Sequence, residues 1–271
     1  MLVKKVSSEE VINVPHKNEC RVLLSIRNKY CPFIAKYYVP KTPVPFEGGE
    51  IFMDHYQVNL ADSQLKEGMK LRVMHDVAMA LYFMVYNGLV HRDMKELNVM
   101  LGGGFRGQLI DFGSTTRFNN NASFQPVDRR VRSTEGYYVP YKKLVSLVPS
   151  LEMREEDYYS HPNFDVYSLG VMFKNEFFLS HIVGESHFLR NHLRFLSEKC
   201  TEINPDKRWS LFQVILYLRQ VVEFMVMEGR YWQAQGINLR GLSSGFGGLQ
   251  LKGPKETVGS YESMRASEKG E

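Results

Sequence analysis

The feature that most constrains the fold is the polar stretch His91–Asn98, which reads His-Arg-Asp-Met-Lys-Glu-Leu-Asn and separates two apolar runs. The run Ala78–Val85 before it predicts a buried helix, which the Asn87-Gly88 pair would end. The run Val99–Leu101 after it predicts a buried strand. The sequence therefore predicts a helix, a turn, a short polar loop and a strand, in that order.

Three side chains of this loop fit one kind of chemistry. Asp93 could accept the proton of a hydroxyl group, and Lys95 could neutralise a phosphoryl group in transfer. Asn98 could hold Mg²⁺ through its carbonyl oxygen. A solvated turn is the alternative for three polar residues after a helix, so the interpretation depends on a second motif.

The second motif is the apolar strand Gln108–Ile110, which runs into Asp111-Phe112-Gly113. One β-hairpin fits between Asp93 and Asp111, so both carboxylates can converge on one site. Together the two motifs resemble the catalytic loop and the Asp-Phe-Gly triplet of eukaryotic protein kinases, and Lys95 is typical of the Ser/Thr branch. The resemblance implies that Asp111 and Asn98 hold Mg²⁺, while Phe112 packs beneath a regulatory helix.

The beginning of the chain predicts a strand over residues 2–6 and a helix that contains residues 19–26. The family pairs a Lys on such a strand with a Glu on such a helix, and the pair holds the α- and β-phosphates of ATP. The resemblance assigns these roles to Lys4 and Glu19. Lys5 is the second candidate, because adjacent strand residues face opposite sides and only one of the two can point into the cleft. A solvated lysine pair on an edge strand is the alternative for both.

Residues 32–38 are expected to form another strand, and residues 39–50, rich in Pro and Gly, a loop. The following strand, Ile51–Tyr56, resembles the one that leads into the hinge between kinase lobes. By that resemblance Met53 is the gatekeeper at the back of the adenine pocket, and Asp54 to Tyr56 supply backbone groups for the adenine edge. An ordinary edge strand entering a loop is the alternative.

The family's glycine-rich loop, which precedes the lysine strand, has no counterpart in this sequence. We expect either that the chain has lost this lid or that the sequence is incomplete at its start. The glycines of Gly102–Gly107 do not replace it, because they lie between the two motifs, where a tight hairpin needs residues with positive φ. They open no helix and so are not expected to bind phosphate.

Residues 114–133 resemble an activation segment, and Ser133–Tyr141 resembles the family's stretch from Gly-Thr to Ala-Pro-Glu. Thr134 would then lie near Asp93 and Lys95. Tyr141 replaces a Glu that forms a buried ion pair in the family, and the matching partner here is Arg208. Breaking a buried pair from one side costs about 3–5 kcal/mol, so Arg208 must find another acceptor or the anchor of this segment is looser.

Three further helices are predicted from apolar residues at helical spacing, over residues 165–173, 188–196 and 211–227. The first begins with Asp165, which by the resemblance holds the backbone of the catalytic loop; an ordinary N-cap aspartate is the alternative. Their Met and aromatic residues are expected in the core.

Composition narrows the class of protein further. A net charge of +4 gives no case for nucleic acid as a partner, and no apolar run is long enough to cross a membrane. The 3 cysteines show no metal-type spacing and predict reduced thiols in a cytoplasmic or nuclear protein.

The predicted fold is α+β, a protein-kinase-like two-lobed fold with a truncated β-rich N-lobe and a mainly α-helical C-lobe. The expected boundaries are residues 1–56 for the partial N-lobe, 57–231 for the C-lobe and 232–271 for a disordered tail. The resemblance implies an enzyme that uses ATP and Mg²⁺ to phosphorylate Ser or Thr of protein substrates. The alternative is a catalytically weak or inactive kinase-fold protein that binds and regulates another kinase.

Overall fold

The computed structural model describes residues 2–5, 14–38, 51–65, 67–117, 133–175 and 187–228. The side chains of residues 2–5 are outside this description. The expected loop over 39–50, most of the expected activation segment and the expected tail also lie outside the described residues.

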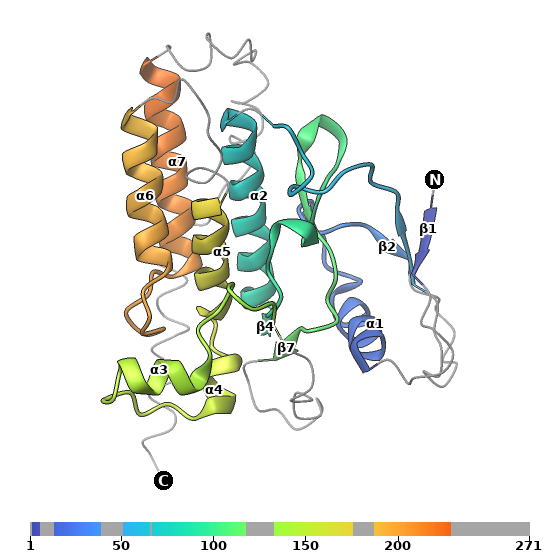
Figure 1. The fold of residues 1–271 in the computed structure, drawn as a ribbon. Coiled ribbons are helices and arrows are strands. Elements are labelled where there is room, and N and C mark those ends of the chain that lie inside the picture. Colours follow the sequence, from blue (N-terminus) through green and yellow to red (C-terminus); the bar gives the residue numbers. More distant parts are fainter. Residues whose placement is uncertain are drawn as a thin grey trace, which may run out of the picture. The chain divides into compact units, whose positions relative to one another are not determined.

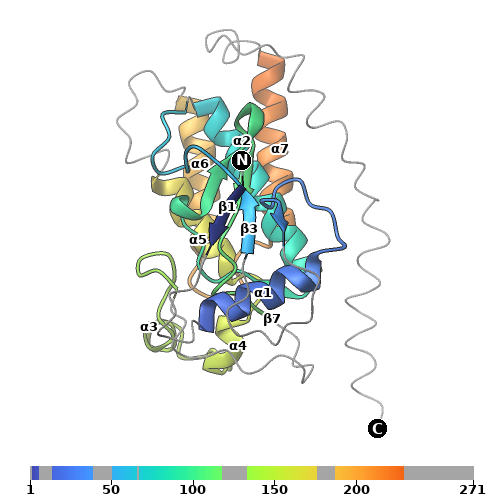
Figure 2. The ribbon, with the colours of Figure 1, turned by 90° about the vertical axis from the view of Figure 1, so that its right-hand side faces the viewer.

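The N-terminal part contains an antiparallel sheet and one helix. Strand β3 (Ile51–Asp54) lies in the centre, between β1 (Leu2–Lys5) and β2 (Tyr37–Tyr38). Figure 2 shows β1 beside β3, with helix α1 (Val14–Ile26) crossing near them. Apolar residues of α1 at helical spacing are buried, among them Val22 and Leu23.

The strand predicted over residues 32–38 is shorter in the structure, where only Tyr37–Tyr38 pairs with β3. The reason is that the preceding residues bond to a different partner. The Leu109 nitrogen donates to the Phe33 carbonyl at 2.8 Å, and the Ala35 nitrogen donates to the Leu109 carbonyl at 3.0 Å. This stretch therefore ties the N-terminal sheet to the strand that ends in Asp111.

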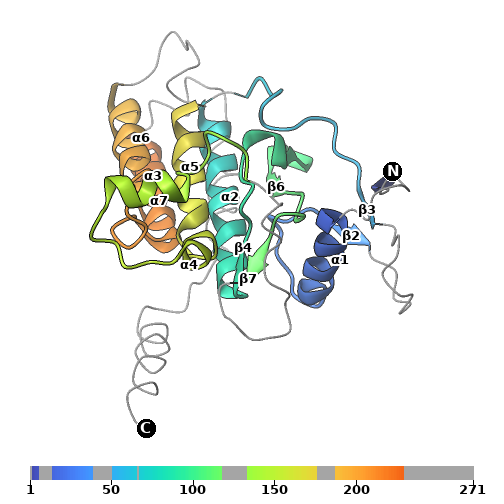
Figure 3. The same cartoon turned by 60° about the horizontal axis from the view of Figure 1, so that its bottom comes forward.

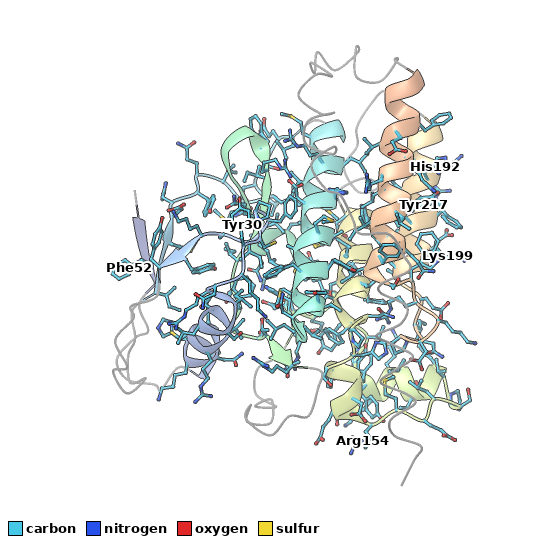
Figure 4. The ribbon with its side chains drawn as sticks, turned by 180° about the vertical axis from the view of Figure 1, so that it is seen from behind. Tyr30, Phe52, Arg154, His192, Lys199 and Tyr217 are labelled. Carbon is cyan, nitrogen blue, oxygen red and sulfur yellow. The ribbon has the colours of Figure 1, made fainter. Side chains whose placement is uncertain are left out.

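The helices form the larger part. Helix α2 (Glu67–Tyr86) contacts α5 (Phe164–Lys174), and α5 contacts α6 (His187–Cys200), as Figure 1 shows. Helix α7 (Leu211–Glu228) lies beside α6, and a hydrogen bond of 2.6 Å joins His192 to Tyr217 across the pair (Figure 4). Gly170 allows α5 and α6 to approach closely, because a Cβ there would lie 2.6 Å from the Cβ of Cys200. The short helices α3 (Tyr141–Leu147) and α4 (Glu155–Tyr159) follow the Ser133–Pro140 stretch.

Two small strand pairs connect the parts around the polar loop. Strand β4 (Leu89–Val90) pairs with β7 (Thr116–Arg117) near the end of α2 (Figure 3), and β5 (Val99–Leu101) pairs with β6 (Gly107–Leu109). Gly104, in the turn between β5 and β6, has a φ of 67°, which a residue with a Cβ rarely adopts. The glycine-rich stretch therefore forms a hairpin, as predicted.

The fold is α+β and mainly helical after residue 57, which confirms the predicted class. The buried helix predicted from the run Ala78–Val85 is part of the longer helix α2, in which Val73, Met74, Ala78 and Leu81 have no exposed surface. Within the described residues, none of the helices combines the length and the apolar character that crossing a bilayer requires.

Candidate active site

The carboxylate of Asp93 lies at the centre of a hydrogen-bond network, just before a 3₁₀ turn over Glu96–Asn98. Its Oδ1 accepts hydrogen bonds from the Thr134 hydroxyl at 2.5 Å and the Thr134 backbone nitrogen at 3.1 Å. Its Oδ2 accepts from the Lys95 Nζ at 2.9 Å and from the Asn98 Nδ2 at 3.2 Å. Burial alone would raise the pKa of Asp93, but the hydrogen bonds from Thr134 and Lys95 outweigh burial and hold the pKa below its ordinary value. The carboxylate is therefore negatively charged at neutral pH.

The cation of Lys95 joins both sides of this network. Its Nζ also donates to the Thr134 hydroxyl at 2.8 Å, so the predicted proximity of Thr134 to Asp93 and Lys95 is present in the structure. The amide nitrogen of Asn98 donates a second hydrogen bond, to the Asp93 carbonyl at 2.7 Å. The Asn98 amide nitrogen is thus held by Asp93 through both backbone and side chain.

The backbone of the loop rests on Asp165, the second residue of α5. Its carboxylate accepts hydrogen bonds from the backbone nitrogens of His91 at 2.6 Å and Arg92 at 2.8 Å. Arg92 has a φ of 73°, so these two bonds hold an unfavourable backbone conformation in place. Asp165 is 1% exposed, and burial raises its pKa although both hydrogen bonds act in the opposite direction. The predicted support of the loop by Asp165 is thus observed.

Contacts on both sides of Asp111 place it beside this loop. The Ile110 nitrogen donates to the Asn98 carbonyl at 3.0 Å, and the Ile110 carbonyl lies 3.1 Å from the Nε2 of His91. On the other side, the Phe112 ring packs edge-on against the His91 ring, with centroids 5.4 Å apart. Asp111 itself has a φ of 63°, an uncommon conformation for a residue with a side chain.

Helix α1 contacts the segment that follows Asp111. The Oε1 of Glu19, which is 1% exposed, accepts a hydrogen bond from the Phe112 nitrogen at 3.3 Å. The Nδ2 of Asn18 donates to the carbonyls of Gly113 at 2.9 Å and Thr115 at 2.8 Å. A Cβ on Gly113 would lie 3.0 Å from Pro15, so a larger residue there would push against the helix. Helix α1 is therefore joined to the backbone of Phe112 and of the residues after it, while the packing of the Phe112 ring beneath this helix stays a prediction.

Comparison with known proteins agrees with this geometry. The family model described as the protein kinase domain matches residues 4–193. The chain belongs to the protein kinase domain family.

Several individual kinases are similar to parts of this chain. Serine/threonine-protein kinase ppk25 of Schizosaccharomyces pombe is 31% identical over 159 residues, which cover 58% of this chain and 31% of that protein. Cyclin-dependent kinase 9-B of Xenopus laevis is 26% identical over 199 residues, covering 70% of this chain and 48% of that protein. Human cyclin-dependent kinase 9 is 28% identical over 135 residues, covering 50% and 33%. The chain thus spans less than two thirds of the length of each of these kinases.

Strand register bears on the lysine of the predicted phosphate site. Lys4 lies opposite Phe52, and Lys5 lies opposite Ile51. Met53 lies opposite Tyr37, whose hydroxyl accepts a hydrogen bond from the Asp111 nitrogen at 3.2 Å. Since alternate residues of a strand share a face, Lys5 occupies the face of Met53 and Tyr37, and Lys4 occupies the face of Phe52.

This register favours Lys5 over Lys4 as the lysine position that shares a face with Met53, and the roles of both lysines stay predictions. Phe52 points away from α1 in Figure 4, and it marks the outer face of the sheet. Sequence order alone does not fix which of two adjacent lysines faces inward.

The expected hinge residues lie directly after β3. Asp54 closes the strand, where its nitrogen donates to the Lys36 carbonyl at 3.2 Å and its carboxylate accepts from the Tyr38 hydroxyl at 3.1 Å. The hydroxyl of Tyr56 bonds to the side chain of Gln108, and this contact joins the hinge segment to β6. Met53 is partly buried on the inner face. The expected hinge segment therefore contacts β6, the strand that precedes Asp111.

The residues at the site suit a hard cation such as Mg²⁺. The donors available are the side-chain oxygen of Asn98 and the carboxylate of Asp111, and oxygen is the ligand type that Mg²⁺ prefers. Among the residues that the structure describes, His, Cys, Asp and Glu form no group of three or more that could hold a metal ion. A site of one carboxylate and one amide oxygen, completed by phosphates and water, needs no such group.

The segment after Thr134 is anchored without the family's ion pair. Arg208 is 3% exposed, and its guanidinium donates to the carbonyls of Glu202 at 2.8 Å, Asn163 at 2.8 Å and Ile203 at 3.1 Å. It also lies 5.2 Å from the centre of the Tyr167 ring. Arg208 has therefore found other acceptors, which was one of the two outcomes expected for the loss of the Glu at position 141.

Two contributors to the site were missed by the sequence reasoning. Tyr37 packs its ring against Phe112, with centroids 5.8 Å apart, but it is one of several tyrosines and no pattern in the sequence distinguishes it. Glu96 is 6% exposed, and its position inside the loop between Lys95 and Asn98 was the signal that could have found it. A charged residue that is buried usually has a partner, because an unpaired charge is costly to bury.

Proposed function

We propose that this protein is an active kinase that transfers the γ-phosphoryl group of ATP to serine or threonine hydroxyls of protein substrates. The observation that supports the proposal most strongly is the network of Asp93, Lys95 and Thr134. It combines a charged carboxylate with a cation at 2.9 Å, and Asn98 donates hydrogen bonds to the same aspartate. A protein relieved of phosphoryl transfer has no physical need to keep all of these groups together.

Asp93 is the proposed base. Its lowered pKa keeps it ionised, so it can accept a hydrogen bond from the substrate hydroxyl and orient that oxygen for attack. As the hydroxyl oxygen bonds to the γ-phosphorus, the bond from that phosphorus to the β,γ-bridging oxygen would break, ADP would leave, and the hydroxyl proton would pass to Asp93. Lys95 stays beside Asp93 and offsets negative charge on the group in transfer.

Asn98 and Asp111 are the residues that would hold Mg²⁺. The cation, when bound with ATP, neutralises charge on the phosphates. The hydrogen bonds from Asn98 to Asp93 keep the metal site and the base in fixed relative positions. Much of the catalytic effect is then positioning, which requires that neither side chain moves during the reaction.

The nucleotide is proposed to bind between the sheet and the catalytic loop. Lys5, with Lys4 as the second candidate, would bind the α- and β-phosphates in front of Glu19. Backbone groups of Asp54 and Tyr56 would bind the adenine edge, with Met53 behind it. We propose the same domain limits as the sequence suggested, residues 1–56, 57–231 and 232–271, and an intracellular site of action, in the cytoplasm or nucleus.

The test is transfer of labelled phosphate from Mg²⁺-ATP to a mixture of Ser, Thr and Tyr peptides. Asp93→Asn should lower transfer by about 10²–10⁴-fold, the usual contribution of a positioned base. Asp157→Asn is the matched control, because Asp157 is exposed and pairs only with Arg154 among the contacts found for it, at 2.7 Å. Its activity should equal that of the wild type.

The outcomes separate the two candidate functions. Label on Ser or Thr that disappears in Asp93→Asn supports the kinase. Label that is equal in the wild type and Asp93→Asn, or absent from both, would favour the second candidate, a kinase-fold protein that binds and regulates another kinase. Label on Tyr alone would reject the proposed substrate class.

A further inference from the structure

Glu96 is a buried carboxylate inside the catalytic loop that the proposed reaction does not use. It is 6% exposed, whereas its neighbour Leu97 is 54% exposed. A carboxylate taken out of water is costly unless donors satisfy its oxygens. Both oxygens of Glu96 have donors, and both donors come from distant parts of the chain.

The donors are Asn175 and Tyr137. The Asn175 Nδ2 donates to the Oε1 of Glu96 at 3.0 Å, across 79 positions of the sequence. The Tyr137 hydroxyl donates to the Oε2, across 41 positions. Asn175 and Tyr137 also meet each other, with the Asn175 Nδ2 3.4 Å from the Tyr137 hydroxyl. The three side chains form a closed group, which we name the Glu96 clamp.

The clamp joins three elements of the site. Glu96 belongs to the 3₁₀ turn that also carries Asn98, and Asn175 directly follows α5, which begins near Asp165. Tyr137 belongs to the turn that starts at Thr134, since its nitrogen donates to the Thr134 carbonyl at 3.2 Å. Its own carbonyl accepts a hydrogen bond from Ser168 of α5 at 2.7 Å. Tyr137 is therefore held from both its backbone and its side chain.

The position of Thr134 depends on this turn. Thr134 bonds to both Asp93 and Lys95, and a shift of the turn would move its hydroxyl and its backbone nitrogen away from the Asp93 carboxylate. Gly136, between Thr134 and Tyr137, has a φ of 90°, so the turn is tightly folded. Hydrogen bonds to a buried carboxylate are stronger than those between neutral groups, and they suit this positioning task.

We infer that the Glu96 clamp positions Thr134 against Asp93 and so aligns the protein substrate, not the nucleotide. Glu96, Tyr137 and Asn175 are positioning residues in this account, because none of them contacts the reacting atoms. The inference rests on the proposed function for its kinetic consequence, but its structural consequence does not require turnover.

The test uses a reversal of donor and acceptor. Glu96→Gln removes the negative charge and one of the two acceptor oxygens, so Asn175 and Tyr137 can no longer each donate to an oxygen of their own. The double variant Glu96→Gln with Asn175→Asp restores the bond in the opposite direction, from the new amide to the new carboxylate. The first readout is amide hydrogen exchange of residues 133–140 in the full chain, where Glu96→Gln should speed exchange of the Thr134 nitrogen by roughly tenfold. The double variant should return it toward the wild-type rate.

The second readout is kinetic. Glu96→Gln should lower kcat/KM for the peptide by roughly tenfold and leave KM for ATP near the wild-type value, and the double variant should recover most of the loss. Unchanged exchange in Glu96→Gln would overturn the inference, as would an equal loss of ATP and peptide affinity. If the wild type transfers no phosphate while the exchange rates follow the prediction, the proposed function fails and the clamp stands.

Discussion

The catalytic loop and the anchor of the following segment both satisfy buried charged side chains, but they use different residues. In the loop, Asp93 takes hydrogen bonds from Thr134, Lys95 and Asn98, and these residues match the kinase pattern. In the anchor, defined here as Arg208 with its three carbonyl acceptors and the neighbouring Tyr141, the acidic partner of the pattern is missing. Both regions nonetheless satisfy their buried charges.

The difference distinguishes a residue with a proposed chemical role from residues that support the fold. A base must have a particular pKa and a particular geometry, so only a carboxylate at position 93 can perform the proposed role. A buried guanidinium needs only acceptors, and backbone carbonyls serve as well as a carboxylate. Tyr141, which replaces the family's Glu, also uses a backbone carbonyl as its acceptor. Its hydroxyl donates to the Met153 carbonyl, and its ring centre lies 6.1 Å from that of Tyr158.

The largest effect on stability is expected at Arg208. Arg208→Met would leave the carbonyls of Asn163, Glu202 and Ile203 without their donor, and the free energy of unfolding should fall by about 3 kcal/mol. Urea unfolding measures this change. Arg154→Met is the control, since Arg154 is exposed and its ion pair with Asp157 lies at the surface, so its unfolding midpoint should stay close to that of the wild type. Equal midpoints for both variants would show that the anchor does not depend on Arg208.

A smaller change in the free energy of unfolding is expected when the Glu of the family pattern is restored at position 141. Tyr141→Glu removes the hydrogen bond to Met153, while Arg208 already has its acceptors, so the free energy of unfolding should fall by about 1 kcal/mol. For Tyr141→Phe, which loses only the hydroxyl, the free energy of unfolding should fall by a similar amount. A rise in stability for Tyr141→Glu would mean that Arg208 still lacks an acidic partner, and the comparison between the two regions would break.

The smallest expected effect is a pH dependence of the free energy of unfolding, which should arise beside the anchor and not in the catalytic loop. His161 lies next to the anchor, where its Nδ1 accepts a hydrogen bond from the Asn163 nitrogen at 3.1 Å. Burial lowers the pKa of His161 below its ordinary value of 6.5, although Asp206 acts in the opposite direction. Below about pH 6.5 the unfolded chain therefore binds a proton that the folded chain resists, and the free energy of unfolding should decrease as the pH falls from 7 to 5.5.

His161→Gln should reduce this decrease, as measured by urea unfolding at the two pH values. His192, whose pKa burial also lowers, should contribute in the same direction in both proteins. The charge of Asp93 should not change over the same range, because its pKa lies below the ordinary value of 3.8. An identical pH dependence in the wild type and His161→Gln would exclude His161 as the cause.

Much of the site could be predicted from the sequence because its residues lie close together in the chain. Asp93, Lys95 and Asn98 fall within one loop, and Asp111 follows after a single hairpin, so local spacing fixes their neighbourhood. The role of Asp165 was predicted from the resemblance of its apolar helix to the central helix of the kinase family. These are positions where the order of elements determines the contact.

The rest depended on information that the sequence does not contain. The choice between Lys4 and Lys5 rests on strand register, and a shift of one residue turns each side chain to the other face. The partners of Arg208 are backbone carbonyls, which every residue carries, so no residue type could signal them. Glu96, Tyr137 and Asn175 come from three separate segments and meet only in the folded chain.

The most direct test of the account measures activity and stability on one variant. For Asp93→Asn, single-turnover transfer of phosphate from Mg²⁺-ATP to a Ser/Thr peptide should fall by at least about 100-fold, while the variant should remain folded and unfold cooperatively in urea. Transfer at the wild-type rate by a folded Asp93→Asn protein would contradict the assignment of Asp93 as the base.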